Sequence, residues 1–511
     1  MKIMEESKSD QINGKTEQEL IANYKINAHG LLADISISKS SKFVPDYTIS
    51  YIGISNASRL LLSSLRTEIT HMVPIDPSKI QDSEYTTIIT NKYTEASSIL
   101  IDKYLPGTNT NVKKLLIAYI INTVIGLGEL EIPLADENLE EITVNGSDDF
   151  IWVYHNVIGW CRTNIKIESE DLIYSRAEQI GRAVGREINM LSPLMDAELA
   201  DGSRVNATLY PVSQSGNTIT IRKFGKNPWT MISMIKNKTI SSDLAALVWL
   251  LVENEISFLI SGGTASGKTS FLNAMSIFFP PSKRIISIEE TRELTLPNFL
   301  QWVPMLSRSP NPEGKGEVTL YNLMINALRQ RPDIMVIGEI RTKKDAETLF
   351  EAIHTGHSVY GTVHADNVQD TIIRISNPPI DIPKILINAI GGIVSVFRHR
   401  KLGIRRVLEI GEILKSGDTS VLYRWNIRDD SFYQINEMSR LLETLGVYSG
   451  LTRKEISDDI AQKSKILNWM SDNNIVDVND SGFIVSQYYL NKSKIFDIIN
   501  QNLKYSKDLF E

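Results

Sequence analysis

The chain has 511 residues, and 54 Lys and Arg against 61 Asp and Glu give it a formal net charge of −7. Its length predicts about three domains, and its single cysteine, Cys161, excludes a disulfide framework and a cysteine-rich zinc module. No apolar run reaches the ~20 residues of a membrane span, and the polar start is unlike a secretory signal. Because the mildly acidic balance also disfavours a dedicated nucleic-acid binder, we expect a soluble, cytoplasmic protein.

The N-terminal half divides by pattern into a leader, a helical segment and a mixed segment. Residues 1–30 are polar and of mixed charge, which predicts a flexible leader. Apolar residues then recur with helical spacing, so residues 31–114 are expected to form a helical N-terminal extension. Residues 115–224 mix helix and strand patterns and are expected to form an α+β N-terminal domain. A run containing Gly and Pro follows, and we expect a linker at residues 225–240.

Residues 241–511 alternate between strand and helix patterns, which favours a mainly parallel sheet covered by helices on both faces. The expected strands are Ile256–Ser261, Arg284–Ile288, Ile334–Ile337 and Val359–Val363. A hairpin is expected around Lys415–Thr419. The C-terminal residues are expected to be helical, and Thr452–Glu455 is a capping box that opens one of these helices. The fold class predicted is therefore α/β.

One motif carries most of the chemistry. Gly262-Gly-Thr-Ala-Ser-Gly-Lys-Thr269 follows an expected strand and precedes an expected helix, which is the context of a phosphate-binding loop. Glycines let backbone N–H groups turn toward phosphates at a helix N-terminus. Lys268 is then expected to contact the β- and γ-phosphates, and Thr269 to hold Mg²⁺. The residues expected to bind the nucleotide are Gly262, Gly263, Thr264, Ala265, Ser266, Gly267, Lys268, Thr269 and Ser270.

Carboxylates follow two other expected strands. Glu339 follows Ile334–Ile337, and the run Glu289–Glu293 follows another strand. Because the carboxyl ends of parallel strands face the ligand crevice, Glu339 can act on the Mg²⁺ shell. Glu290 and Glu293 can orient or deprotonate the attacking water. Each acid taken alone would more often be a solvated surface residue, and it is their shared position that favours the site.

Three histidines, His354, His357 and His364, lie around the strand expected at Val359–Val363. A zinc site is disfavoured because no cysteine lies near and because His357 and His364 flank a strand instead of sharing a helix face. We expect imidazoles at the end of this strand to sense the γ-phosphate by hydrogen bonding. The alternative is that these histidines cap a helix or are satisfied within the core.

Together these motifs resemble the secretion-superfamily ATPases that power type II secretion, type IV pili and the archaeal flagellum (archaellum). The matching boxes are the phosphate loop Gly262–Thr269, the acidic box Ile288–Glu293, the second nucleotide box Gly338–Arg341 and the histidine box Thr355–His364. One cysteine cannot build the four-cysteine zinc domain of many bacterial relatives. The chain therefore looks most like the archaeal branch, and within it the archaellum motor ATPase.

The resemblance implies a RecA-like P-loop core that uses ATP and Mg²⁺. Carried onto this sequence, the family pattern makes Glu293 the likeliest general base, Glu339 the support for Mg²⁺, and His357 and His364 the sensors of the nucleotide. Glu290 stands where many relatives have Asp, which is a mild change.

The resemblance also implies a homohexamer with a nucleotide between its domains. Arg204 and Arg222 are then expected to meet a phosphate across a subunit or domain boundary, with a surface salt bridge as the alternative for each. Expected partners are a membrane platform protein and other cytoplasmic motor components, with no nucleic acid and no metal cluster. The protein would associate peripherally with the cytoplasmic face of the membrane and drive assembly or rotation of an archaellum. Type IV pilus assembly or a type II secretion-like role is the alternative.

Two other functions are more distant. A nucleic-acid translocase needs a basic groove with interleaved aromatic residues, and the sequence has no such patch. A GTPase switch is suggested by Thr342-Lys-Lys-Asp345, but this run follows Arg341 directly instead of ending its own strand. We interpret it as the start of a helix.

Overall fold

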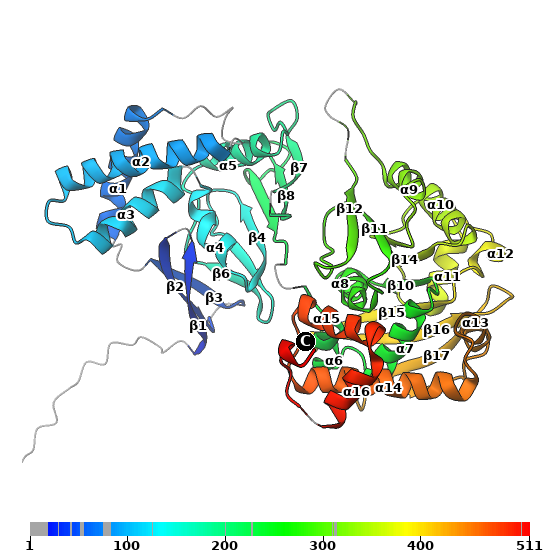
Figure 1. Cartoon of the computed structure of the whole chain (residues 1–511). Coiled ribbons are helices and arrows are strands. Elements are labelled where there is room, and N and C mark those ends of the chain that lie inside the picture. Colours follow the sequence, from blue (N-terminus) through cyan, green and yellow to red (C-terminus); the bar gives the residue numbers. More distant parts are fainter. Residues whose placement is uncertain are drawn as a thin grey trace, which may run out of the picture. The chain divides into compact units, whose positions relative to one another are not determined.

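A computed structural model describes residues 19–28, 30–40, 43–51, 56–74, 83–124, 126–199, 201–225, 228–308, 310, 314–501 and 503–510. The chain forms two compact units, Met1–Gly225 and Lys226–Glu511 (Figure 1). Of the predicted leader, residues 1–18 lie outside the described residues. The two units are described separately below.

The first unit is built on a nine-stranded sheet in the order β1-β2-β3-β6-β5-β4-β9-β8-β7. Its strands are β1 (Leu20–Ala28), β2 (Leu31–Ser38), β3 (Asp46–Tyr51), β4 (Leu139–Asn145), β5 (Trp152–His155), β6 (Gly159–Thr163), β7 (Leu194–Glu198), β8 (Arg204–Thr208) and β9 (Thr218–Arg222). Neighbouring strands are antiparallel except β3 and β6. The helices of this unit are α1 (Asn56–Met72), α2 (Ser83–Tyr104), α3 (Thr110–Val124), α4 (Glu131–Ala135) and α5 (Glu170–Ala183).

The first three strands correct the prediction for the N-terminal residues. The described residues between 20 and 51 form the strands β1, β2 and β3 instead of a leader or a helix. In β2 the alternate residues Leu31, Ala33, Ile35 and Ile37 are all buried, and this period of two is that of a strand with one face in the core. Among the described residues the first helix is α1, so the described helices of the predicted extension lie in the later part of its range.

Among the described residues, no single helix has the length and hydropathy to cross a membrane; one bent pair, Thr110–Val124 with Gly128–Ala135, passes on length and composition.

Asp136 fastens the three N-terminal strands to the rest of the first unit. Its Oδ2 atom accepts hydrogen bonds from the hydroxyls of Tyr24 in β1 at 2.7 Å and Tyr47 in β3 at 2.6 Å. Its Oδ1 atom accepts from the backbone N–H of Asn138 at 2.9 Å. Asp136 is almost fully buried, and a buried donor that loses its partner bears the whole desolvation penalty.

We expect Asp136→Ala to loosen β1 and β3 selectively, because hydrogen bonds to a charged group are each worth about 1.5–3 kcal/mol. A loss of about 3 kcal/mol of local stability corresponds to roughly 100-fold faster amide exchange. Hydrogen-exchange mass spectrometry of β1 and β3 measures this. Tyr24→Phe removes one hydroxyl and should give a much smaller effect, whereas equal exchange in Asp136→Ala and wild type would contradict the anchoring role.

The second unit is built on another nine-stranded sheet, in the order β12-β11-β13-β14-β10-β15-β16-β17-β18. Its strands are β10 (Phe258–Gly262), β11 (Arg284–Glu289), β12 (Gln301–Leu306), β13 (Ile334–Ile337), β14 (Ser358–Val363), β15 (Gly392–His399), β16 (Ile404–Ile413), β17 (Thr419–Asn426) and β18 (Ser431–Gln434). From β12 to β15 every pair is parallel, and from β15 to β18 every pair is antiparallel. The predicted α/β class and the β16–β17 hairpin are confirmed.

Helices cover both faces of this sheet, as the burial of alternate strand residues shows. Ile260, Val336 and Tyr360 belong to one hydrophobic cluster, while their chain neighbours Leu259, Met335 and Val359 belong to another. The first cluster includes residues of α6 (Met231–Lys236), α7 (Ser242–Glu253), α8 (Lys268–Met275), α13 (Arg440–Ser449), α14 (Arg453–Asp472), α15 (Val478–Leu490) and α16 (Lys492–Asn500). The second includes residues of α9 (Leu320–Leu328), α10 (Lys343–His354), α11 (Val368–Ser376) and α12 (Lys384–Ile387).

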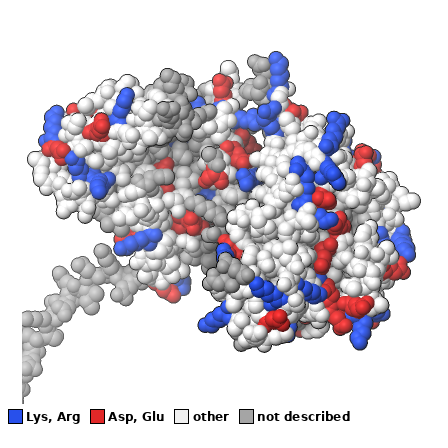
Figure 2. Space-filling model, in the orientation of Figure 1, with Lys and Arg blue, Asp and Glu red and all other residues white. Residues whose placement is uncertain are grey.

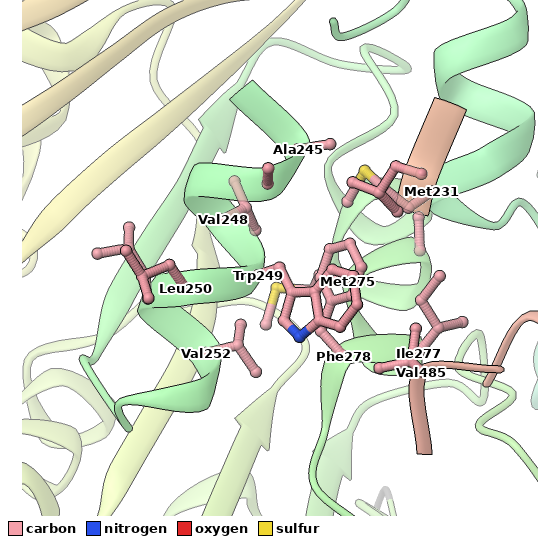
Figure 3. Packing of buried hydrophobic residues seen from close by; sticks show 14 of the residues in the cluster. Met231, Ala245, Val248, Trp249, Leu250, Val252, Met275, Ile277, Phe278 and Val485 are labelled. Carbon is pink, nitrogen blue, oxygen red and sulfur yellow. The ribbon is translucent and has the colours of Figure 1, made fainter. Parts of the chain in front are cut away.

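Helix α6 corrects the predicted linker. The chain does divide at residues 225 and 226, but Met231, Ile232 and Met234 are buried in the core of the second unit. Figure 3 shows Met231 in the same cluster as Trp249 of α7, whose ring stacks on Phe278 with centroids 5.2 Å apart. Most of the range predicted as linker is therefore part of the second unit.

Candidate nucleotide site

The predicted phosphate loop is a tight turn between β10 and α8. Gly267, at φ +98°, caps the helix, and Ala265 also has a positive φ. Gly262 lies against β15, where a Cβ atom would clash with the Val396 carbonyl and the Ser266 hydroxyl. Glycine is thus required at Gly262 by close approach and at Gly267 by conformation. All the residues expected to bind the nucleotide, from Gly262 to Ser270, lie in this turn or the first turn of the helix.

Lys268 folds back over the loop. Its Nζ atom donates to the carbonyls of Gly262 at 2.8 Å and Gly263 at 3.2 Å. Burial lowers the pKa of Lys268, and the carboxylates of Glu339 and Glu293 act in the opposite direction. The ammonium therefore lies over the loop, with both predicted carboxylates within electrostatic range.

Glu339 is held at the end of β13 by both neighbouring strands. The N–H of Gly338 donates to Ile288 of β11 at 2.9 Å, and the N–H of Ile340 donates to Thr362 of β14 at 2.9 Å. The Thr362 hydroxyl also donates to the Gly338 carbonyl. These bonds fix the backbone on both sides of Glu339, so its side chain projects at the same edge of the sheet as the phosphate loop.

Arg341 joins two of the carboxylates. It donates to Glu339 Oε2 from Nη2 at 2.7 Å and from Nε at 3.1 Å, and from Nη1 to Glu290 Oε2 at 2.6 Å. Exposed ion pairs of this kind are worth about 0–1 kcal/mol, so the pairing arranges Glu339 and Glu290 more than it stabilises the fold. Arg341 is the last residue of the second nucleotide box, and the sequence alone predicts no role for it.

The acidic run divides into one buried and two exposed glutamates. Glu290 and Glu293 are exposed, but Glu289 is the last residue of β11 and only 1% exposed. Its Oε1 atom accepts from the N–H groups of Glu293 at 2.9 Å and Leu294 at 3.1 Å. Burial raises the pKa of Glu289 to about 7, against the lowering effect of these two bonds. The predicted strand ended at Ile288, which hid the buried position of Glu289.

The structure brings only one of the two expected histidine sensors to the loop. His364 follows β14, and its Nε2 atom lies 3.0 Å from the Thr264 hydroxyl. His357 precedes β14, and its Nδ1 atom lies 3.1 Å from Thr355 Oγ1 and from the Ala352 carbonyl. A six-residue strand separates the two histidines, about 20 Å at 3.3 Å per residue. His357 is therefore at the opposite edge of the sheet, because a strand carries its two ends apart. His354 ends α10 at that same far edge.

Arg204 and Arg222 lie in the first unit, directly opposite each other on β8 and β9. Both are exposed. Arg204 makes a two-point ion pair with Asp196, from Nε at 3.0 Å and Nη2 at 2.6 Å, which is the surface salt bridge considered as the alternative. Arg222 also pairs in register with Glu141. Like charges opposite each other on a sheet are unfavourable, so the nearby acids offset their repulsion.

Two further side chains at the loop were missed. Arg405 of β16 donates from Nε to the Ala265 carbonyl at 3.3 Å. Asp366 lies beside Gly263, where an added Cβ atom would be 3.1 Å from Oδ1. Both residues reach the loop only through the tertiary fold, so local sequence carries no signal for them.

A turn that cradles anions, a lysine over it and carboxylates at neighbouring strand ends define the second unit as a P-loop nucleotide-binding protein. The family model "Type II/IV secretion system protein" matches residues 128–397, more than half of the chain. The chain belongs to the type II/IV secretion system protein family.

The chain is also similar to individual proteins and to solved structures. An uncharacterized protein of Methanocaldococcus jannaschii, MJ0781, is 35% identical over 67% of this chain, which spans only 46% of that relative's length. A putative conjugal transfer protein of Mycobacterium tuberculosis, MT3759, is 31% identical over 54% of this chain and 77% of its own length. The X-ray structure of the Legionella pneumophila ATPase DotB is 16% identical, covers 69% of this chain and 93% of its own, and gives a TM-score of 0.41.

The raised pKa of Glu289 predicts a pH-dependent stability. The folded state holds the Glu289 proton up to about pH 7, whereas the ordinary value is 4.5. The free energy of unfolding should therefore be highest below pH 4.5 and fall as the pH rises through 7, by about 3 kcal/mol at most. Urea unfolding at pH 5 and pH 8 should show this fall in wild type and a smaller one in Glu289→Gln, which does not titrate. Identical pH dependence in both proteins would contradict it.

Proposed function

We propose that this chain is a hexameric ATPase motor that couples Mg-ATP hydrolysis to assembly or rotation of a surface filament through a membrane platform protein. The observation that carries the proposal is the convergence of Lys268, Glu339 and the segment bearing Glu293 at one edge of the sheet. Binding and hydrolysis of a nucleoside triphosphate need these groups together.

Each residue has a role in this proposal. The loop N–H groups and Lys268 bind the phosphates, and Glu293 orients or deprotonates the attacking water. The donor set fits a magnesium ion, because hydroxyl and carboxylate oxygens are its preferred ligands. Thr269 and Glu339 would hold Mg²⁺, which supplies charge neutralisation at the β- and γ-phosphates. His364, bonded to Thr264 in the loop, senses whether the loop is occupied.

The finer parts of the proposal rest on the family resemblance. A homohexamer would let Arg204 and Arg222 reach a phosphate across a boundary, and an arginine in that role is worth about 10³–10⁵-fold in phosphoryl transfer. An archaeal relative and a single cysteine, too few for a four-cysteine zinc domain, support the archaeal branch. Within that branch the resemblance favours the archaellum motor. Type IV pilus assembly and a type II secretion-like role remain the alternatives, since all three use the same motor chemistry.

The nucleic-acid translocase is a distant second function. A relative is described as a putative conjugal transfer protein, which is the observation in its favour. On the face shown in Figure 2, Lys and Arg are interspersed with Asp and Glu. Salt-sensitive stimulation of hydrolysis by single-stranded DNA would support the translocase.

The test is ATP hydrolysis by wild type beside Lys268→Ala and Glu339→Ala, with the mass followed by light scattering with and without ATP. We expect each variant to lose about 10²–10³-fold in kcat, because each removes a group that stabilises the transferring phosphoryl charge. Wild type should grow to a hexamer with ATP.

Lys384→Ala is the matched control. This exposed lysine lies outside the loop, and its Nζ atom is 3.2 Å from Asp418 Oδ1. It should keep wild-type turnover. A wild-type protein that binds nucleotide without turnover would contradict the motor and favour a switch, and competition by GTP over ATP would favour a GTPase.

A further inference from the structure

Glu289 is the buried carboxylate of the nucleotide site. Glu290 and Glu293 are exposed and Glu339 is half-buried, whereas Glu289 lies inside the fold at the end of β11. Among the described residues, its Oε2 atom has no hydrogen-bond partner. Burying a carboxylate is costly, so its retention at this position calls for a compensating contact.

That contact is with the backbone of the acidic segment. Residues 290–297 contain no helix or strand, so the N–H groups of this segment have no ladder to join. Glu289 Oε1 accepts from two of them in succession, those of Glu293 and Leu294. The next N–H, of Thr295, donates to Asn273 of α8 at 2.7 Å.

These three consecutive bonds fix the main chain at and just beyond Glu293. The Leu294 side chain is fully buried, which turns the backbone inward immediately after Glu293. Because successive side chains point in different directions, the Glu293 carboxylate is exposed at the sheet edge while its own N–H is held from inside. A carboxyl group can accept both N–H groups through Oε1 whether or not it carries a proton.

We propose that Glu289 is a positioning residue, which holds the Glu293 carboxylate in place by accepting the N–H groups of Glu293 and Leu294. The inference rests on the proposed function, in which Glu293 acts on the attacking water. Glu289 itself does not touch the nucleotide. It acts through the backbone of its neighbour, and a displacement of about 1 Å in a reacting group can lower a rate by about 10²-fold.

Two substitutions distinguish the effect of the hydrogen bonds from the effect of side-chain size. Glu289→Gln keeps an oxygen that can accept both N–H groups. Glu289→Met keeps a similar length and volume without an acceptor. Should Glu289→Met not fold, Glu289→Ala takes its place.

Glu412 provides a matched control in the same unit. It is also fully buried, and it accepts from the N–H groups of Ser439 at 3.0 Å and Leu441 at 2.9 Å, where α13 begins. Glu412→Met therefore removes a carboxylate anchor of the same kind outside the acidic segment. It should leave turnover per folded molecule and exchange at residues 293 and 294 unchanged.

The first measurement is amide hydrogen exchange of nucleotide-free protein, which does not depend on turnover. We expect the N–H groups of Glu293 and Leu294 to exchange about 10–100-fold faster in Glu289→Met and at wild-type rates in Glu289→Gln. Unchanged exchange in Glu289→Met overturns the anchoring, whatever the turnover.

The second measurement is steady-state ATP hydrolysis. We expect Glu289→Met to lower kcat about 10²-fold with KM within about threefold of wild type, and Glu289→Gln to restore kcat to within about threefold. In a Glu293→Gln background, Glu289→Met should cause no further loss, because its effect passes through Glu293. Equal kcat in Glu289→Met and wild type, equal losses in both Glu289 variants, or the full loss in the Glu293→Gln background overturns the positioning role. A wild type without turnover overturns the proposed function and leaves the exchange result to decide the anchoring.

Discussion

The parallel alignment of neighbouring strands is the constraint on which the site depends. β10, β11, β13 and β14 run in the same direction, so the residues that follow each strand meet at one edge. The phosphate loop, Glu339, the acidic segment and His364 come from four separate stretches of sequence, and no local motif joins them. Gly262 lies close against Val396 of β15, which keeps the start of the loop next to this edge of the sheet. A side chain at Gly262 would push the loop away from every group that has to act with it.

Helices hold the backbone that follows Glu293, and one of them, α15, lies near the C-terminal end of the chain. Asn273 lies on the buried face of α8, accepts the N–H of Thr295 and donates to the Trp229 carbonyl at 3.5 Å. The same acidic segment continues to Asn298, whose N–H donates to Asn479 of α15 at 2.9 Å. The helices α13–α16 lie beyond the region matched by the family model, residues 128–397. The segment that follows Glu293 is therefore held in part by a helix outside the matched region.

The parts of the site that could be predicted from sequence are those that neighbouring residues in the chain determine. The loop from Gly262 to Thr269 is set by glycine conformation and by its place between a strand and a helix, and Glu339 by its place after an apolar strand. When several glutamates follow one another in a run, no local pattern indicates which of them is buried. Glu289, Glu290 and Glu293 differ in burial by where β11 ends, and a strand boundary one residue short hid the buried one.

The remaining differences also come from tertiary structure. β1, β2 and β3 pack alternating residues against the core. The polar outer residues of β1 resemble a leader in composition, and β2 and β3 fall in the range predicted as a helical extension. The Pro304 ring in β12 argues against a strand except at a sheet edge, which is where β12 lies. His357 was grouped with His364 because they are close in sequence. They lie at opposite ends of β14, so only His364 is at the loop. Arg341 contacts Glu339 and Glu290, and Arg405 and Asp366 lie at the loop, through contacts that only the folded chain creates.

Side chains of both charges meet at the edge of the sheet that carries the phosphate loop. Glu290, Glu293, Glu339 and Asp366 face Lys268, Arg341 and Arg405, and Arg341 is already shared between two of the acids.

A nucleoside triphosphate adds about four negative charges, and like charges 4 Å apart repel by about 4 kcal/mol at an effective dielectric constant of 20. In the proposed function, a bound triphosphate would therefore add to the negative charge of the acids at this edge, and Mg²⁺ would offset part of it. Arg204 and Arg222 would offset more if they meet a phosphate as the resemblance implies, and hydrolysis would then depend on their approach.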